Sequence, residues 1–261
     1  MTCNRAAYIR LVSWNVFNEN LEVSRVVDAL KELRPDVALL QEATDAHLEG
    51  VASLYPHLER CRDYALRGEM CRLAIASSRP LQNVRVVAHF DDEKPPGSWL
   101  ARRTGWVEFL DTISADVSVG GSALRLVLLH TSAGAPPTVR RRELEAASVH
   151  IPSSGACLVA ADFNAFASPW LAPILALPLG YSWSDWRVSE LKDNDAFFRR
   201  FELAPAVRGV TFPRFRLQMD QIYFRRLRLG RAEIIRRLWG SDHRPILIEA
   251  ATDHQPAPDP R

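Results

Sequence analysis

Acidic, amide and imidazole side chains recur at the ends of short apolar runs in this sequence. Four such runs have polar residues directly after them, and two later runs have polar residues directly before them. If the two later runs form strands antiparallel to the others, all of these side chains fall on one rim of the sheets. Such a rim has the composition of a metal and acid/base site. The residues are Asn15, Glu42, His130, Asp162, Asn164, Asp220, Asp242 and His243.

The side-chain types on this rim favour a hard cation and phosphate chemistry. Oxygen donors without thiolates suit Mg2+ or Mn2+ better than zinc. None of the 4 cysteines has the CxxC or Cys/His spacing of a zinc or redox motif. Phosphoester hydrolysis needs a cation that neutralises the phosphoryl charge, a base that orients water and donors for the non-bridging oxygens. The rim offers residues for each need, so we expect a phosphate-containing substrate.

The size and composition are those of a globular domain. The chain has 261 residues, of which 47% are hydrophobic and 25% are charged, and its net charge is +2. These values argue against disorder and against a disulfide scaffold. We expect one domain over residues 1–251 and a disordered polar tail over residues 252–261. No apolar signal segment or membrane-spanning run is visible, which predicts a cytoplasmic protein without stable membrane insertion. The oligomeric state is open, with a monomer as the simplest state.

Apolar periodicity predicts many strands and few long helices. Residues 21–33 have helical spacing and are followed by Pro35, and residues 139–149 form a second candidate helix. Loops are expected at residues 91–98 and 133–137, where proline and glycine cluster. This pattern favours stacked sheets flanked by helices. The predicted strands are residues 8–16, 37–40, 73–76, 84–89, 106–110, 124–129, 158–161, 222–224 and 246–248.

Several motifs, in their order along the chain, resemble the endonuclease/exonuclease/phosphatase superfamily. The most specific are SDHRP at residues 241–245, which matches the family's terminal Ser-Asp-His-x-Pro motif, and PDVALLQE at residues 35–42, which resembles its strand ending in a metal-binding glutamate. ADFN at residues 161–164 resembles Gly-Asp-Phe-Asn, with Ala161 in place of the glycine. Supporting motifs are SWNV at 13–16, LAIASSRPL at 73–81, LHT at 129–131 and MDQIYF at 219–224.

The resemblance extends from residue 8 to residue 250 and implies both a fold and a metal site. The fold would be α/β (α+β), a four-layered α/β sandwich with two packed mixed β-sheets flanked by helices, with the site between the sheet edges. Glu42 would bind Mg2+ or Mn2+ directly, with the amide oxygen of Asn15 nearby and Asp242 as a metal or outer ligand. Considered alone, Glu42 could be a surface carboxylate and Asn15 an ordinary strand-end residue.

The resemblance also implies acid/base roles. Asp162 would orient or deprotonate the attacking water, and Asn164 would hold that water or a phosphoryl oxygen. His243 would donate to a phosphoryl oxygen while Asp220 fixes its tautomer, and His130 would donate to the phosphate or assist the leaving oxygen. Considered alone, residues 162–164 would form a turn that caps its own backbone, and a strand-end histidine is more often structural.

Three functions are compatible with these residues. The first is a metal-dependent hydrolase acting on ester bonds, a nuclease or phosphodiesterase of nucleic acid, because arginines crowd the last quarter of the chain. The second is a phosphatase or lipid-headgroup phosphodiesterase, of the inositol phosphate or sphingomyelin type, that uses the same site. The third is a catalytically inactive interaction module, which the retained Glu42, Asp162 and His243 disfavour. Abasic-site specificity is also disfavoured, because the tyrosine-bearing segment of apurinic endonucleases is missing.

Other residues could contact a substrate or serve only the fold. Aromatic side chains at residues 181, 183 and 186 could stack on bases or touch lipid, but core packing is the favoured use of at least two of them. Arginines at residues 79, 102, 103 and 142 could bind phosphate or lie solvated on the surface. We therefore assign none of these residues to the catalytic set.

Overall fold

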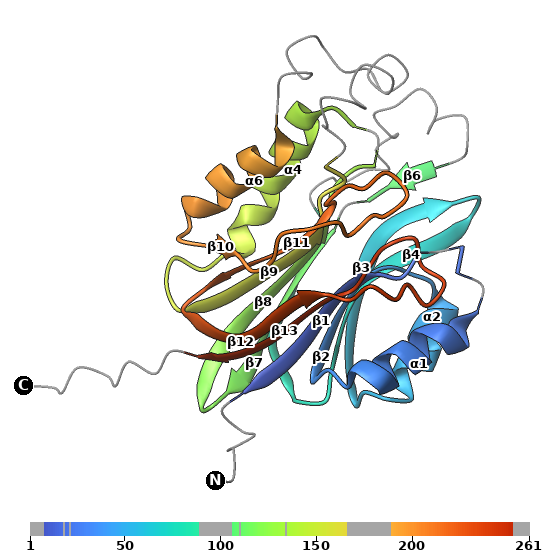
Figure 1. Ribbon diagram of the computed structural model, residues 1–261, viewed down its shortest axis with the longest axis horizontal. Coiled ribbons are helices and arrows are strands. Elements are labelled where there is room, and N and C mark those ends of the chain that lie inside the picture. The colour runs from blue at the N-terminus through green and yellow to red at the C-terminus, as the bar shows by residue number, and fades with distance from the viewer. Residues whose placement is uncertain are drawn as a thin grey trace, which may run out of the picture.

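Two mixed β-sheets lie face to face, with helices on their outer faces (Figure 1). The structure is a computed structural model that describes residues 8–17, 19–20, 22–88, 106–109, 111–133, 135–165 and 189–252. The predicted four-layered α/β sandwich is confirmed. The expected loop at residues 91–98, the aromatic residues at 181–186, Arg102 and Arg103, and residues 253–261 of the expected tail lie outside the described residues.

The first sheet has seven strands. They are β1 (Ile9–Asn15), β2 (Val37–Ala43), β3 (His57–Leu66), β4 (Glu69–Ser77), β6 (Trp106–Glu108), β12 (Leu227–Ile234) and β13 (Ile246–Thr252). Their order across the sheet is β12-β13-β1-β2-β4-β3-β6. The central position of β1 and β2 places Asn15 and Glu42 in the middle of the sheet.

The second sheet has six strands. They are β5 (Leu81–Val87), β7 (Thr112–Val119), β8 (Ser122–His130), β9 (Ala156–Asp162), β10 (Ala204–Pro205) and β11 (Asp220–Arg225). Their order is β10-β11-β9-β8-β7-β5. The strands that end or begin at His130, Asp162 and Asp220 are therefore direct neighbours.

Helices cover the outer face of each sheet. The first sheet is covered by α1 (Val23–Leu33) and α2 (Asp45–Ala52), and the second by α4 (Pro137–Ala147), the short 3-10 turn η2 (Ser148–His150) and α6 (Glu190–Arg199) (Figure 1). None of the helices in the described ranges is both long and apolar enough to cross a bilayer.

Alternating side chains in the strands produce these layers. In β1, Ile9 and Leu11 pack into the core between the sheets, whereas Val12 and Trp14 pack into the core beneath α1 and α2. Both faces of β1 are therefore buried, and every one of these four side chains has an exposed fraction of 0%. Burial on both faces fixes the register of a strand, because a shift by one residue would exchange its two faces. The end of β1, with its asparagine, is thus held at a defined depth.

Strand directions bring the polar ends together. β1 and β2 are parallel, while β13 is antiparallel to β1. In the second sheet β8 and β9 are parallel, and β11 is antiparallel to β9. Cross-strand pairing places His130 opposite Asp162 and Asp162 opposite Asp220, so the three residues form a row across neighbouring strands. The expected antiparallel arrangement of the two late strands, and with it the single rim, is confirmed.

The sequence reading of individual elements is confirmed in part. The helices expected at residues 21–33 and 139–149 correspond to α1 and α4, and each of the nine expected strands overlaps an observed one. The structure adds α2, α6, β3, β7, β10 and β12, which were not expected. β3 and β12 are rich in charged residues and partly exposed, so their apolar signal is weak. α2 has only eight residues, too few for a clear helical period.

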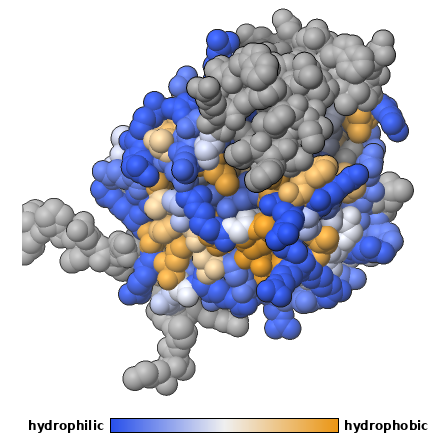
Figure 2. Space-filling model, turned by 45° about the horizontal axis from the view of Figure 1, so that its top comes forward, coloured by the Kyte–Doolittle hydropathy of each residue, from blue (hydrophilic) through white to orange (hydrophobic). Residues whose placement is uncertain are grey.

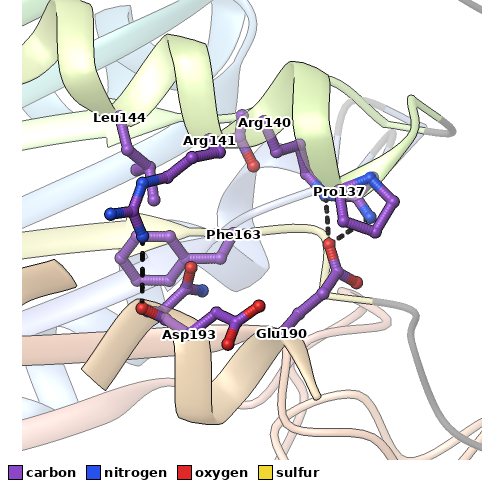
Figure 3. Close-up of a pocket in the computed structure, with 9 residues that line it drawn as sticks. Pro137, Arg140, Arg141, Leu144, Phe163, Glu190 and Asp193 are labelled. Carbon is purple, nitrogen blue, oxygen red and sulfur yellow. Dashed lines mark hydrogen bonds and ion pairs between the residues drawn. The ribbon is translucent and has the colours of Figure 1, made fainter. Parts of the chain in front are cut away.

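Two helices support the turn that follows β9. α4 and α6 lie on either side of Phe163, and their contact includes a small cavity of about 50 Å³ (Figure 3). Across this contact the buried Arg140 guanidinium donates to the Glu190 carboxylate at 2.8 Å and also to the carbonyl oxygen of Ala135. Because Phe163 stands between Asp162 and Asn164 in the chain, this helix pair fixes the backbone that carries both residues.

We expect Arg140→Ala to lower the free energy of unfolding by about 3–5 kcal/mol, because the buried Glu190 carboxylate loses the guanidinium. The measurement is urea denaturation followed by circular dichroism. The matched control is Arg142→Ala on the same helix, because Arg142 is exposed and makes no ion pair with a described residue, so its loss should cost about 1 kcal/mol or less. Equal losses in the two variants would contradict a buried helix–helix ion pair.

Candidate active site

Glu42 occupies an unusual backbone position near the end of β2. Its φ is +56°, in the left-handed region that a side chain with a β-carbon seldom adopts. The pairing of β2 with β4 shifts register between Leu40 and Ala43, which is the mark of a β-bulge. The Glu42 amide donates to an Asp63 carboxylate oxygen at 3.1 Å and so stabilises this turn of the backbone. The bulge directs the Glu42 side chain toward the rim.

Asn15 connects Glu42 to the second sheet. Its amide nitrogen donates to Glu42 Oε1 at 2.8 Å and to Asp162 Oδ2 at 2.9 Å, while its amide oxygen accepts from the backbone of Phe17 at 3.0 Å. The amide nitrogen, and not the oxygen, therefore faces the two carboxylates. The second Glu42 oxygen accepts from the Tyr64 hydroxyl at 2.7 Å. Burial raises the pKa of Glu42, although His130 and the Asn15 hydrogen bond act in the opposite direction.

Asp162 lies at the centre of the cluster and is almost completely buried. Burial opposes ionisation of its carboxyl group, but His243 and His130, together with hydrogen bonds from Asn164 and Asn15, hold its pKa below the usual range. His243 Nδ1 and His130 Nε2 lie 3.6 Å and 3.8 Å from Asp162 Oδ2. Asp162 is therefore ionised at neutral pH with an imidazole on each side.

Asn164 is held in the turn after β9. Its φ is +45°, a left-handed conformation that asparagine adopts more readily than most residues. Its backbone amide donates to Asp162 Oδ1 at 2.9 Å, and its side-chain amide donates to the Thr131 carbonyl oxygen at 2.8 Å. The turn expected from sequence is thus present, and the same residue reaches the site. Its amide nitrogen also lies 2.8 Å from His130 Nε2.

His130 is the first of two imidazoles paired with a carboxylate. Its Nδ1 lies 3.0 Å from both oxygens of Asp63, a buried residue of β3. Burial lowers the pKa of His130, but Asp63, Asp162 and Glu42 together raise it well above its ordinary value. The Asn164 amide can donate to His130 Nε2 only when this nitrogen carries no proton, so this hydrogen bond forms with the neutral imidazole. A divalent cation among these carboxylates would offset their charge and favour that neutral form.

His243 and Asp220 form the second pair. His243 Nδ1 lies 2.8 Å from Asp220 Oδ2, and the Trp14 indole donates to the His243 carbonyl at 3.1 Å. Burial lowers the pKa of His243, but Asp220 and Asp162 raise it to about 10. Burial raises the pKa of Asp220, whose position is fixed further by the hydrogen bond from its backbone amide to Thr211. The pair therefore carries a proton on the imidazole at neutral pH.

Asp242 lies at the edge of the cluster. Its Oδ1 is 3.9 Å from His243 Nε2, and this oxygen is buried without a hydrogen-bond partner. Burial raises the pKa of Asp242. Two groups of described side chains are close enough to share an ion: Glu42 with His130 and Asp162, and Asp162 with Asp220 and His243. Asp242 belongs to neither group.

Sequence reasoning missed Asp63 and Tyr64. Both are buried residues of β3, where they contact His130 and Glu42 respectively. They lie inside a strand whose charged residues hide its apolar alternation, and no motif marks them. The alternation of Cys61 and Asp63 with the arginines Arg60 and Arg62 was the available signal, since a carboxylate on the buried face of a strand requires a partner.

The cluster fits a divalent cation. Carboxylates outnumber imidazoles among these buried residues, and a buried excess of negative charge is costly unless a cation balances it. The donors are oxygen and nitrogen atoms of carboxylate, amide and imidazole groups, and the buried cysteines of the described chain are not among them. The buried Asp242 oxygen without a partner is a further sign that a positively charged group belongs here.

Residues 12–243 match the Endonuclease/Exonuclease/phosphatase family, which is most of the chain. The chain belongs to this family. Its members are hydrolases that act on phosphoester bonds and generally use a divalent metal. No curated protein matches the sequence at a significant level.

Solved structures share the fold at low sequence identity. An endonuclease/exonuclease/phosphatase protein from Beutenbergia cavernae has a TM-score of 0.71 at 14% identity, over 97% of this chain and 73% of that one. TDP2 from D. rerio, complexed with a single-strand DNA product, has a TM-score of 0.63 at 16% identity, over 94% and 100%. The human Nocturnin catalytic domain with a bound sulfate anion has a TM-score of 0.62 at 15% identity, over 95% of each chain.

We expect Asp63→Asn to lower kcat on a chromogenic phosphodiester by roughly 10²- to 10⁴-fold, because His130 would lose the charge that sets its tautomer and orientation. The control is Asp116→Asn, which removes a carboxylate paired with Arg125 in the same sandwich but away from the rim. Thermal melting would separate lost activity from lost folding. Normal turnover in Asp63→Asn would show that His130 needs no orienting carboxylate.

Proposed function

We propose that this protein is a divalent-metal-dependent phosphodiesterase that cleaves nucleic acid. Family membership supports hydrolysis of a phosphoester bond. The observation that carries the proposal is the convergence of two imidazole–carboxylate pairs on Asp162, at 3.6 Å from one imidazole and 3.8 Å from the other. This arrangement supplies an ionised carboxylate for water and one protonated imidazole, that of His243, for phosphate within one buried cluster.

Each side chain of the cluster has a separate role in the proposed reaction. Asp162 orients the attacking water and accepts its proton, and Asn164 positions the same water or a phosphoryl oxygen. His243 holds Asp220 with Nδ1 and presents Nε2 as a cationic donor to a phosphoryl oxygen. His130, oriented by Asp63, faces Asp162 from the other side, and it would assist the departing oxygen when its Nε2 carries a proton in place of the hydrogen bond from Asn164.

A divalent cation completes the site. Glu42 would hold it, with Asp162 and His130 within reach and Asn15 and Asp242 beside them. Bound there, magnesium or manganese supplies positive charge to the phosphoryl oxygens.

An exposed hairpin beside His243 supports nucleic acid as the substrate. Phe212 packs on the His243 ring at 4.9 Å between centroids, and a bridge from Phe212 to Leu217 closes the hairpin. At the tip of the hairpin, Phe215 is 43% exposed, and its ring centroid lies 5.7 Å from that of Phe212. The Arg214 guanidinium lies over the Phe215 ring. An exposed aromatic ring next to arginine suits a base with its phosphate.

Likeness to known structures supports a nucleotide substrate as well. One similar structure is TDP2 with a single-strand DNA product. Another is ANGEL2, a 2',3'-cyclic phosphatase, in complex with adenosine-2',3'-vanadate. The ANGEL2 structure has a TM-score of 0.65 at 15% identity, over 95% of this chain and 96% of that one. The second likeness keeps a nucleotide phosphatase as the alternative function. Hydrophobic areas on the face in Figure 2 are separated by hydrophilic ones. A lipid-headgroup substrate would use the same catalytic residues and is a further alternative.

The function is tested with a substrate panel of plasmid and single-stranded DNA, RNA, a chromogenic phosphodiester, a 2',3'-cyclic nucleotide and inositol phosphates. We expect turnover of nucleic acid with magnesium or manganese and none with a chelator. Asp162→Ala should lower turnover by roughly 10²- to 10⁴-fold, as for loss of a positioned base. The same variant controls for a contaminating nuclease. Activity confined to the cyclic nucleotide or to inositol phosphates would reject nucleic acid as the substrate.

We expect Phe215→Ala to raise KM for single-stranded oligonucleotides about 5- to 100-fold, the scale of one lost base–aromatic stack of roughly 1–3 kcal/mol. Turnover of the chromogenic phosphodiester should be unchanged, because Phe212 still packs on His243. Phe215→Trp, which keeps a ring at this position, should restore most of the affinity. If Phe215→Ala binds oligonucleotides like the wild type, the hairpin does not contact bases.

A further inference from the structure

A basic groove lies beside the catalytic cluster, at the edge where the two sheets meet. It has a volume of about 490 Å³ and is lined by residues 206–210, which run from β10 toward the site, and by residues 232–234, Arg236 and Arg244. Residues 206–210 are followed in the chain by Thr211 and Phe212, and the Phe212 ring packs on the His243 ring. One side of the groove is therefore adjacent in the chain to the residue that packs on His243.

The groove has an excess of positive charge. Three arginines, Arg208, Arg236 and Arg244, line it together with a single carboxylate, Glu233. Arg208 is paired with Asp195, and Glu233 is paired with Arg231 outside the groove. Arg236 is exposed and makes no ion pair with any residue that the structure describes. The groove thus retains positive charge that its own walls do not neutralise.

Arg244 joins the groove to the active site. It follows His243 in the chain, and its backbone amide donates to the Thr211 carbonyl at 2.8 Å. Its guanidinium donates from Nη1 to the Val210 carbonyl at 3.2 Å, but its Nε is buried without a hydrogen-bond partner. A buried guanidinium donor without an acceptor calls for a ligand oxygen, since unsatisfied buried donors are costly.

Some other arginines of the same region have structural roles. Arg225 donates to three backbone carbonyls, those of Gly155, Phe201 and Pro152. Arg237 pairs with Glu32 on α1. The arginine excess in the last quarter of the chain is therefore not a uniform basic surface, and Arg236 and Arg244 are the arginines without an ion pair among the described residues that line this groove.

We propose that this groove binds the phosphodiester backbone of a single nucleic acid strand that continues past the catalytic site. The proposal rests on the function proposed above and adds to it that the substrate is a chain of several nucleotides. The groove volume of about 490 Å³ lies within the range of about 300–1,000 Å³ that is usual for small-molecule sites, which gives room for at least one nucleotide unit. A positively charged groove that follows the backbone is how proteins bind single strands without reading their sequence.

The test compares Arg236→Ala with Arg228→Ala. Arg228 is an exposed arginine on β12 that lies outside the groove, so both variants lose one positive charge. Binding of fluorescent single-stranded oligonucleotides of increasing length is measured by anisotropy in an Asp162→Asn background. Beyond a threshold length, Arg236→Ala should weaken binding about 3- to 10-fold and lower the salt dependence by about 0.7 per lost phosphate contact. Arg236→Lys should retain most of the binding.

Three results would overturn the groove assignment. One is equal binding by Arg236→Ala and Arg228→Ala at every length. Another is equal weakening by Arg236→Ala at every length, with slower turnover of the chromogenic phosphodiester, which indicates damage to the site. The third is full competition by inorganic phosphate at the affinity of the oligonucleotide, which indicates a small-anion site.

The outcome of this test is separate from that of the proposed function. If the wild type binds oligonucleotides through Arg236 but cleaves none, the groove assignment stands and the proposed function is wrong. If the wild type cleaves nucleic acid and Arg236→Ala matches Arg228→Ala, the function stands and the groove assignment is wrong.

Discussion

The structure of the site depends on placing several carboxylates together inside protein. Each buried carboxylate loses hydration, and neighbouring carboxylates repel one another. The chain offsets these costs with imidazoles and with donors: Asp63 faces His130, Asp220 faces His243, and the Asn15 amide lies between Glu42 and Asp162. The compensation is local and incomplete, as the buried Asp242 oxygen shows. A cation is therefore the natural completion of the cluster.

Two sheets are needed to build such a cluster. Within one sheet, cross-strand pairing aligns His130, Asp162 and Asp220 in a row, and the facing sheet brings Asn15 and Glu42 against that row. The row is rigid because its strands are buried on both faces and α4 and α6 hold the turn at Phe163. Left-handed backbone at Glu42 and Asn164 adds local strain that this surrounding packing can sustain. The packing of the buried strands and of α4 and α6 thus stabilises the backbone conformations that orient the side chains of the site.

The sequence predicted what depends on local pattern. Strands buried on both faces are continuous apolar runs, and the polar residues at their ends, from Asn15 to His243, mark the rim. Asp63 and Tyr64 could not be found this way, because they lie within a strand of mixed polarity and act through contacts with residues far along the chain. The amide orientation of Asn15 and the bulge at Glu42 also follow from tertiary contacts, which no local spacing encodes.

The two basic features near His243 differ in what they can recognise. The hairpin offers a ring and charge to a base and its phosphate, whereas the groove offers only charge and hydrogen-bond donors to a backbone. Both are connected to His243 by short links, through the Phe212 ring and through Arg244. A strand that used both would be held near His243 by a contact to one of its bases and by contacts to its backbone. Stacking and backbone contacts distinguish poorly between bases, so such binding would position a strand for cleavage with little dependence on its sequence.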